Sequence, residues 1–170
     1  MAYPEILILR HLSRRPAHGY ELRKRIEETT GVVINNNSLY PALKRFVEAG
    51  AVRMTVEQQD SKPPRHVYEL TDVGRELLHD LIAELPATQA GDDMEFFTRL
   101  GQFVFLEPAE RTAILDARSA ALTTHLARLT ALADRTSADF WSSIVVTRLR
   151  DQTQAELRWL DGLRAEAART

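Results

Sequence analysis

The side chains in this sequence that are most clearly suited to binding lie within one short stretch, residues 35–50. It supplies an amide, two hydroxyls and an ammonium group, carried by Asn37, Ser38, Tyr40 and Lys44. All four groups form hydrogen bonds with polar partners. Because Tyr40 and Lys44 are four residues apart, they would be neighbours on one face of a helix. The stretch therefore predicts a helix that presents polar groups along one side, as a helix lying in a DNA groove requires.

The rest of the stretch indicates how such a helix would be held in place. Apolar residues recur at helical spacing and would attach one face to a core; they are Leu39, Leu43, Phe46 and Val47. Asn37 or Ser38 can cap the amino end, and Gly50 stands where a left-handed residue would end the helix. Many ordinary surface helices share this pattern, so its interpretation depends on the residues around it.

Two shorter helices are predicted ahead of this stretch. The first covers residues 3–12, and the break at residues 13–16 separates it from a second helix that opens at His18 and ends at Gly31. Three short helices within about fifty residues, the last two closely joined, are typical of a helix-turn-helix core.

The segment behind this core changes from helical to strand periodicity. Val52, Met54 and Val56 alternate with polar residues, and residues 65–70 resume the alternation after a polar loop. Two strands and a loop in this position predict a wing, whose cations Lys62 and Arg65 would lie along a phosphate backbone. Thr71 would then cap a further helix that continues to residue 85. The predicted fold is mainly α with a small β-hairpin, a winged helix-turn-helix.

Five blocks of the sequence, in this order and spacing, resemble the PadR transcriptional regulators. They are residues 18–22 (HGYEL), 38–43 (SLYPAL), 48–50 (EAG), Arg65 with Tyr68, and 70–75 (LTDVGR). The resemblance implies a winged helix-turn-helix domain over roughly residues 4–85 and a repressor that binds specific DNA sequences. The chain departs from the family pattern at Phe46-Val47 in the third helix and at Pro63-Pro64 and His66 in the wing.

The residues and the resemblance together give a set of candidate DNA contacts. They are Tyr20, Asn37, Ser38, Tyr40, Lys44, Arg45, Lys62 and Arg65. Two of them have a plain structural alternative. Tyr20 could pack against the third helix instead of reaching a phosphate, and Arg65 could be an ordinary charge at a strand end.

Residues 86–170 are predicted to form a separate helical domain, which the resemblance identifies with a dimerisation domain. Asp92 or Asp93 would cap a helix through residues 96–106, and a long helix would follow to about Asp134. Thr136 or Ser137 would cap the last helix. A seam at alternating spacings of four and three is typical of paired helices; it consists of Leu115, Ser119, Leu122, Leu126, Leu129 and Ala133.

The three carboxyl-terminal helices carry more apolar surface than one thin domain can bury, which favours a homodimer. The alternative is a monomer in which they fold back on the winged domain. Phe96, Phe103 and Trp141 are candidates for lining a pocket for a small apolar or aromatic effector. Core packing is the plain alternative for all three aromatic residues.

Composition excludes several classes of chemistry. Cysteine is absent, the five histidines lack metal-helix spacing, and there is no glycine-rich phosphate loop or nucleophile elbow. We therefore expect no metal site, no cofactor and no enzymatic activity. No run is long enough for a membrane helix and no signal peptide is visible, so a cytoplasmic location is expected.

The net charge of −2 conceals a difference between the two halves of the chain. Residues 1–70 hold 11 Lys and Arg but 8 Asp and Glu, whereas residues 71–170 hold the remaining 11 against 16. A basic amino-terminal part and an acidic carboxyl-terminal part are consistent with a DNA-binding domain of residues 1–85 joined to a helical domain of residues 86–170.

We interpret the sequence as that of a homodimeric regulator that binds a palindromic operator in double-stranded DNA. The resemblance implies that it is a repressor, and an effector bound to the helical half would release it from DNA. The alternative is a winged-helix module for protein–protein contact that has no operator of its own.

Overall fold

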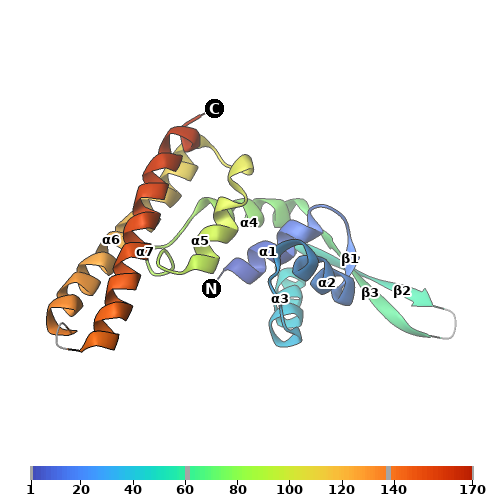
Figure 1. Ribbon diagram of the computed structural model, residues 1–170. Helices are drawn as coiled ribbons and strands as arrows, with labels where there is room; N and C mark the ends of the chain where they lie inside the picture. Colours follow the sequence, from blue (N-terminus) through green and yellow to red (C-terminus); the bar gives the residue numbers. More distant parts are fainter. Residues whose placement is uncertain (1, 60–61, 137–138, 170) are drawn as a thin grey trace. The chain divides into compact units, whose positions relative to one another are not determined.

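The computed structural model describes residues 2–59, 62–136 and 139–169, which belong to two compact units, Met1–Ile82 and Ala83–Thr170 (Figure 1). Unit 1 is mainly helical with a small antiparallel sheet, which confirms the predicted fold class. Its elements are α1 (Tyr3–Leu12), β1 (Ala17–His18), α2 (Gly19–Thr30), α3 (Asn36–Glu48), β2 (Val52–Gln59), β3 (Lys62–Leu70) and α4 (Asp72–Ala83).

The core of unit 1 is built around α1, which packs against α2, α3 and β3. Residues 6–9 of α1 are all buried, so this helix is covered on more than one side. The facing helices contribute apolar residues predicted from their helical spacing, namely Leu22, Ile26, Leu39, Leu43 and Phe46, together with Ala42. Val47, which was predicted for the same face of α3, is only half-buried. Burying each large apolar side chain contributes about 1.5–3 kcal/mol, enough to hold α3 firmly by one face.

A buried histidine fixes the contact between α1 and α2. In α1, the Nδ1 atom of His11 lies 2.7 Å from the carbonyl oxygen of Leu7, and its Nε2 atom lies 2.7 Å from the Thr29 hydroxyl of α2. Burial lowers the pKa of His11; the hydrogen bond to Leu7 opposes this shift, and the charges of neighbouring arginines add to it. In the neutral ring with a proton on Nδ1, Nδ1 donates to Leu7 and Nε2 accepts from the Thr29 hydroxyl, which then exchanges its 2.8 Å hydrogen bond to the Arg25 carbonyl for the one to His11.

The sheet has the strand order β1-β3-β2, and both pairings are antiparallel. The strand β1 was not predicted, because Ala17 was assigned to no element and His18 was assigned to the start of a helix. Ala17 pairs with Tyr68 and His18 with Val67, so β1 ties the start of α2 to the base of the wing. A two-residue strand is too short to show a period, and only its long-range partner defines it.

The prediction that one face of β2 is buried is correct only at the beginning of the strand. Val52 is buried, but Met54 and Val56 are 41% and 50% exposed. The register pairs Met54 with Tyr68 and Val56 with His66 as the hairpin extends away from the helical core. The alternation of apolar residues therefore marks the strand correctly but overstates how much of it is covered.

The helix α3 starts earlier than the sequence suggested. Asn35, not Asn37 or Ser38, is the cap, and its side-chain oxygen accepts a 2.8 Å hydrogen bond from the Ser38 amide. Its carboxyl end is as predicted, because Gly50 has φ +72° and ends the helix. Gly50 N donates to the Val47 carbonyl and Ala51 N to the Phe46 carbonyl, the two bonds of a Schellman motif.

The start of α4 shows why a glycine stands where a capping-box glutamate was possible. Thr71 caps the helix as predicted, with its hydroxyl accepting from the Gly74 amide at 3.1 Å. A Cβ atom on Gly74 would lie 2.1 Å from the backbone oxygen of Ala51 and 2.6 Å from a methyl of Leu70. The helix ends at Ala83, two residues before the predicted end.

Unit 2 is helical throughout its regular elements, which are α5 (Asp93–Leu100), the short helix η1 (Phe103–Phe105), α6 (Pro108–Thr136) and α7 (Phe140–Ala167). The predicted single helix over residues 96–106 is wrong, because α5 ends at Leu100 and a separate turn of helix follows Gly101. Asp92 caps α5, as one of the two predicted alternatives.

The helices α6 and α7 lie side by side as a long hairpin (Figure 1). In α6 the predicted seam is buried at Leu115, Leu122 and Leu129, and in α7 a seven-residue spacing is buried; its members are Val146, Thr153, Leu160 and Ala167. The cap of α7 is Asp139, not Thr136, and Ser137 lies outside the described residues. Within the described part of the chain, no helix has the length and apolar character that crossing a membrane requires.

Candidate nucleic-acid interface

The polar face of α3 is exposed along its whole length. Leu39, Ala42 and Leu43 are buried on one side, while Asn37, Ser38, Tyr40, Pro41 and Lys44 are exposed on the other. The cap at Asn35 places Asn37 and Ser38 in the first turn, where backbone amides still lack helical partners. The helix thus presents hydroxyl, amide and ammonium groups on a rigid support.

A groove of about 420 Å³ brings three candidate contacts together from three elements of unit 1. Tyr20 comes from α2, Tyr40 from α3 and Arg65 from β3. The other lining residues are His18, Gly19, Glu21, His66 and Tyr68. Because β1 fixes the start of α2 beside β3, the wing and the helices supply one continuous surface.

The contact between α2 and α3 in this groove depends on a missing side chain. A Cβ atom on Gly19 would lie 2.7 Å from Cε1 of Tyr40 and 3.0 Å from its hydroxyl oxygen. Burial raises the pKa of the Tyr68 phenol, and the neighbouring Tyr40 adds to the rise. The Tyr68 phenol is therefore protonated at neutral pH. The hydroxyl group of Tyr40 is of a type that both donates and accepts hydrogen bonds.

Tyr20 points to solvent and is 67% exposed. The guanidinium carbon of Arg23 lies 5.7 Å from the centre of its ring, a cation–π contact on the surface. Arg23 also reaches α3, where it donates to the side-chain oxygen of Asn36 at 3.5 Å. The exposed ring and its arginine are free to meet a phosphate.

The two cations of α3 both have acidic neighbours. Lys44 Nζ lies 3.8 Å from a carboxylate oxygen of Glu48, and Arg45 Nη2 lies 2.6 Å from one of Glu5 in α1. Exposed ion pairs of this kind contribute about 0–1 kcal/mol, so either cation can exchange its partner for a phosphate at small cost. Arg65 is exposed and lines the groove. The backbone of Lys62 begins β3, but its side chain lies outside the described part of the chain.

Several residues of this surface were not singled out by sequence reasoning. His18 Nδ1 lies 3.2 Å from the carbonyl oxygen of His66, and its Nε2 lies 3.6 Å from Glu57. Gly19 and Asn36 also belong to this surface and were also not selected from the sequence. The sequence signal for His18 and Gly19 was their position directly before Tyr20, whereas Asn36 had none beyond its place in an asparagine run. Among the described residues, no group of His, Asp and Glu could hold a metal ion.

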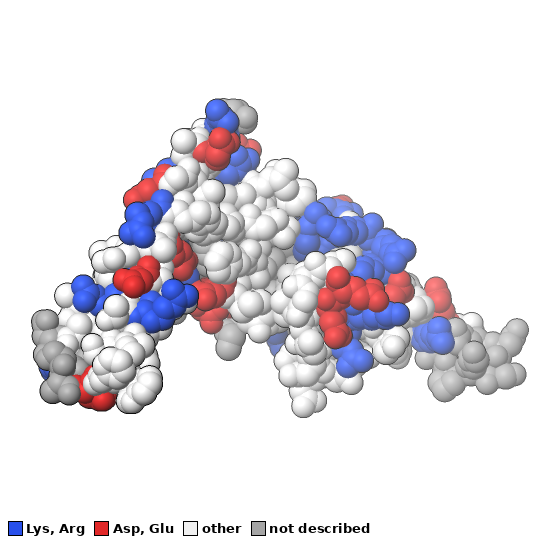
Figure 2. All heavy atoms as spheres, viewed as in Figure 1, with Lys and Arg blue, Asp and Glu red and all other residues white. Residues whose placement is uncertain are grey.

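Basic side chains also gather away from α3, over the end of α1 and the segment leading to β1 (Figure 2). Arg10, Arg14 and Arg15 belong to this region, and Arg25 of α2 donates to the Arg15 carbonyl at 3.4 Å. Burial and the nearby charge of Arg14 lower the pKa of Arg10. The basic excess of residues 1–70 is therefore shared between two surfaces.

The three predicted effector residues do not share a cavity in the described part of unit 2. Phe96 is fully buried beneath the guanidinium of Arg118, 5.2 Å from its carbon. Phe103 lines a hollow of about 310 Å³ formed with α6 and α7. Trp141 is 73% exposed and stacks edge-on with Phe140.

Comparison with known proteins finds transcriptional regulators to which this chain is similar. Negative transcriptional regulator PadR of Bacillus subtilis (strain 168) is 26% identical over 171 residues, which cover 93% of each chain. The crystal structure of Bacillus subtilis PadR in complex with operator DNA is 23% identical, covers 98% of both chains and has a TM-score of 0.47. A PadR family transcriptional regulator from Eggerthella lenta DSM 2243 is 32% identical over 48% of this chain and 72% of its own, with a TM-score of 0.42.

The family model of the PadR-like transcriptional regulators matches residues 8–80. This range includes the second half of α1, all of α2, α3 and the wing, and most of α4. It therefore contains every candidate DNA contact identified above. Residues 8–80 thus match the PadR-like family of transcriptional regulators.

Proposed function

We propose that the protein is a repressor that binds a palindromic operator in double-stranded DNA as a homodimer. The observation that carries this proposal is the continuous surface of unit 1 on which Tyr20, Tyr40 and Arg65 line one groove beside the polar face of α3. Three elements that present exposed hydrogen-bond donors on one surface suit a duplex, which offers base edges and phosphates together.

In this proposal α3 enters the major groove with its amino-terminal half foremost. Recognition helices contact base edges mostly with their first turns, and here those turns carry Asn37, Ser38 and Tyr40. Lys44 follows one turn later and reaches a base edge or the flanking phosphate. Arg45, which pairs with Glu5, would contact only the backbone.

The wing and α2 would hold the flanking phosphates. Arg65 and Lys62 lie on β3, and Tyr20 of α2 lines the same groove as Arg65. Phosphate contacts of this kind fix the orientation of a protein on DNA and supply most of the salt-dependent affinity. The wing thus positions α3 and adds little sequence discrimination of its own.

Dimerisation is assigned to unit 2, whose helices expose large apolar side chains. On α7 they recur at spacings of one and four residues, as Phe140, Trp141, Ile144 and Val145. An exposed stripe of this kind marks an interaction site in soluble proteins. A second copy of the same chain would cover it and would set two α3 helices on half-sites about one DNA turn apart.

The repressor sense rests on the name of the Bacillus subtilis relative, a negative regulator. We further propose that a small-molecule effector bound to the helical half releases DNA by favouring a conformation with lower operator affinity. The protein would act in the cytoplasm, where the operator lies, and would have no catalytic activity.

The assignment of α3 is tested by Lys44→Ala in fluorescence anisotropy titrations against operator and random duplexes at two salt concentrations. Operator affinity should fall by about 1–3 kcal/mol if Lys44 meets a base edge, and all DNA should weaken alike if it meets a phosphate. Lys24→Ala is the matched control, because Lys24 is also an exposed helical lysine with an acidic neighbour four residues on, at 3.7 Å.

Unchanged affinity of the Lys44→Ala protein for both duplexes would contradict the placement of α3 in the groove. A folded wild-type protein that binds neither duplex would favour the alternative of a winged-helix module for protein contacts. DNA binding whose logarithm falls linearly with the logarithm of salt concentration would support the proposal.

A further inference from the structure

Four guanidinium groups form a basic surface of unit 1 at the end of α1, which we call the α1–β1 patch (Figure 2). They belong to Arg10, Arg14, Arg15 and Arg25. The carboxylate of Glu21 pairs with two of them, at 3.3 Å from Arg15 Nη2 and 2.7 Å from Arg25 Nη2. Arg14 is exposed, and its side chain has no hydrogen bond or ion pair in the ranges that the structure describes. The patch therefore carries more positive charge than its paired carboxylate neutralises.

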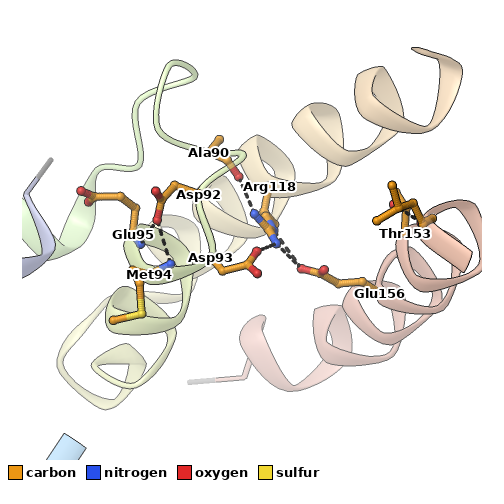
Figure 3. A network of polar contacts seen from close by, with 9 residues as sticks. Ala90, Asp92, Asp93, Met94, Glu95, Arg118, Thr153 and Glu156 are labelled. Atoms are coloured by element: carbon orange, nitrogen blue, oxygen red, sulfur yellow. Dashed lines mark hydrogen bonds and ion pairs between the residues drawn. The ribbon is translucent and has the colours of Figure 1, made fainter. Parts of the chain in front are cut away.

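Two arginines outside the patch show how the chain elsewhere balances such charges. Arg118 of unit 2 is buried, and its guanidinium lies 2.5 Å from Asp93 and 2.8 Å from Glu156 (Figure 3). Arg75 of α4 is exposed, and its Nε donates to Asp72 at 3.1 Å. The exposed turn of the α1–β1 patch lacks a carboxylate of this kind, so its charge is available to an external anion.

The turn that carries the patch is fixed at both ends. The Ser13 hydroxyl donates to the Arg10 carbonyl at 2.8 Å and accepts from Arg10 Nη1 at 3.0 Å. Arg25 of α2 donates to the Arg15 carbonyl at 3.4 Å, and β1 pairs with β3 directly after the turn. Side chains on an ordered support lose less conformational freedom when they bind a partner. The arginines of the patch are thus presented in advance of binding.

The patch and α3 lie on opposite flanks of α2. Arg23 donates to the side-chain oxygen of Asn36 in α3, whereas Arg25 donates to the turn of the patch. Positions two residues apart in a helix differ by about 200° around its axis. The buried Leu22 and Ile26 face the core between these two flanks. A duplex held by α3 would have to bend around α2 to reach the patch, at a cost in deformation energy, whereas a second duplex needs no such bend.

The composition of the patch favours phosphates over a protein surface. No large apolar side chain is exposed within residues 10–16, all of which the structure describes. The centres of protein–protein interfaces depend on apolar and aromatic anchors, which this surface does not offer. All four cations of the patch are arginines, whose planar N–H groups match phosphate oxygens in a bidentate geometry.

We propose that the α1–β1 patch binds the phosphate backbone of a second DNA duplex while α3 holds the operator. Each copy of the chain then has two DNA-binding surfaces, and the protein bridges two segments of double-stranded DNA. The second contact carries no sequence preference, because phosphates are the same at every base pair. The bridging role rests on the proposed function, since α3 must hold the operator.

A capture assay with the full-length protein tests the second surface. An operator obtained by genomic selection is trimmed to its two half-sites, immobilised and saturated with protein, so that every α3 helix is occupied. A fluorescent duplex of random sequence is then added. It should be captured with a Kd of about 1–100 µM at physiological salt, the range of sequence-independent binding.

Arg14→Gln removes the charge that has no partner within the protein. It should weaken capture of the second duplex about three- to tenfold and lower the slope of log affinity against log salt by about 1. Its affinity for the trimmed operator should equal that of wild type, which also shows that the variant is folded. Arg75→Gln is the matched control, because it removes the same charge from an exposed arginine of unit 1 that already has a carboxylate partner. It should leave capture unchanged.

An operator-bound protein that captures no second duplex would overturn the proposal, and so would equal capture by wild type and Arg14→Gln. Weaker binding of Arg14→Gln to an operator with long flanks, but not to the trimmed one, would overturn it by assigning the patch to the same duplex. Tighter capture of double-stranded RNA than of DNA of the same sequence would overturn the assignment to DNA. A protein that binds no operator in the first step would instead refute the proposed function, so the two failures are distinguishable.

Discussion

Replacing Gly19 with alanine tests whether the groove between α2 and α3 positions Tyr40 for DNA. The added Cβ atom would lie 2.7, 3.0 and 3.1 Å from three atoms of the Tyr40 ring. Ordinary contacts between such atoms are about 3.5–4.0 Å, so the ring must move by several tenths of an ångström or turn out of the groove. Alanine itself favours a helix over glycine by about 0.5–1 kcal/mol, so the fold should lose little stability.

The expected loss is in operator affinity, by about 1–3 kcal/mol if Tyr40 makes a base contact. Fluorescence anisotropy at one fixed salt concentration measures it for Gly19→Ala, Tyr40→Leu and the double variant. If the glycine acts through the ring, the double variant should bind no worse than Tyr40→Leu, because no ring is left to displace. Gly162→Ala is the control, since nothing lies within 4 Å of a Cβ atom at that position.

Additive losses in the double variant would refute this reasoning, because they would show that Gly19 acts independently of Tyr40. Wild-type operator affinity in the Gly19→Ala protein would refute it as well. A lowered melting temperature with unchanged operator affinity would show that the contact between Gly19 and Tyr40 stabilises the fold and does not contribute to DNA binding.

Two further predictions concern the stability of unit 1. Gly74→Ala should destabilise the protein by about 3 kcal/mol or more, since its Cβ would lie 2.1 Å from the backbone oxygen of Ala51 and the start of α4 must shift. A thermal denaturation curve that matches wild type would contradict this close contact between Gly74 and Ala51. Burial lowers the pKa of His11 below its unfolded value, so its contribution to stability is present above about pH 6.5 and is lost as the pH falls. Urea unfolding at pH 7.5 and pH 5 should show this loss, and His11→Gln should flatten the dependence; an equally steep dependence in that variant would assign the effect to another group.

The parts of the fold that could be predicted are those governed by local periodicity. The buried face of α3, the left-handed Gly50 and the alternation in β2 all follow from the spacing of residues near one another in the chain. The strand β1 could not be found in this way, because its two residues are defined only by pairing with β3.

The caps were harder to predict because several neighbouring residues have suitable side chains. Asn35 caps α3 within a run of three asparagines, and Asp139 caps α7 shortly after Thr136. Which residue takes the role depends on where the backbone leaves the extended conformation. The break after Leu100 was missed because the apolar spacing continues through Gly101 into η1.

The candidate interface was predicted through residue types and not through its geometry. Tyr20, Tyr40 and Arg65 were selected as polar or aromatic residues on predicted elements, and the structure brings them to one groove. Gly19 was missed as a positioning residue because its role comes from an absent side chain.

The most direct test of the account is selection of bound genomic fragments followed by footprinting of the strongest one. Fragments enriched by the wild-type protein should share a palindrome, with two protected half-sites whose centres are about one DNA turn apart. Protection should depend on the exposed face of α3, so the Lys44→Ala protein should lose or broaden it. Fragments without a common palindrome, or a footprint that Lys44→Ala leaves unchanged, would contradict the central claim that two α3 helices read one operator.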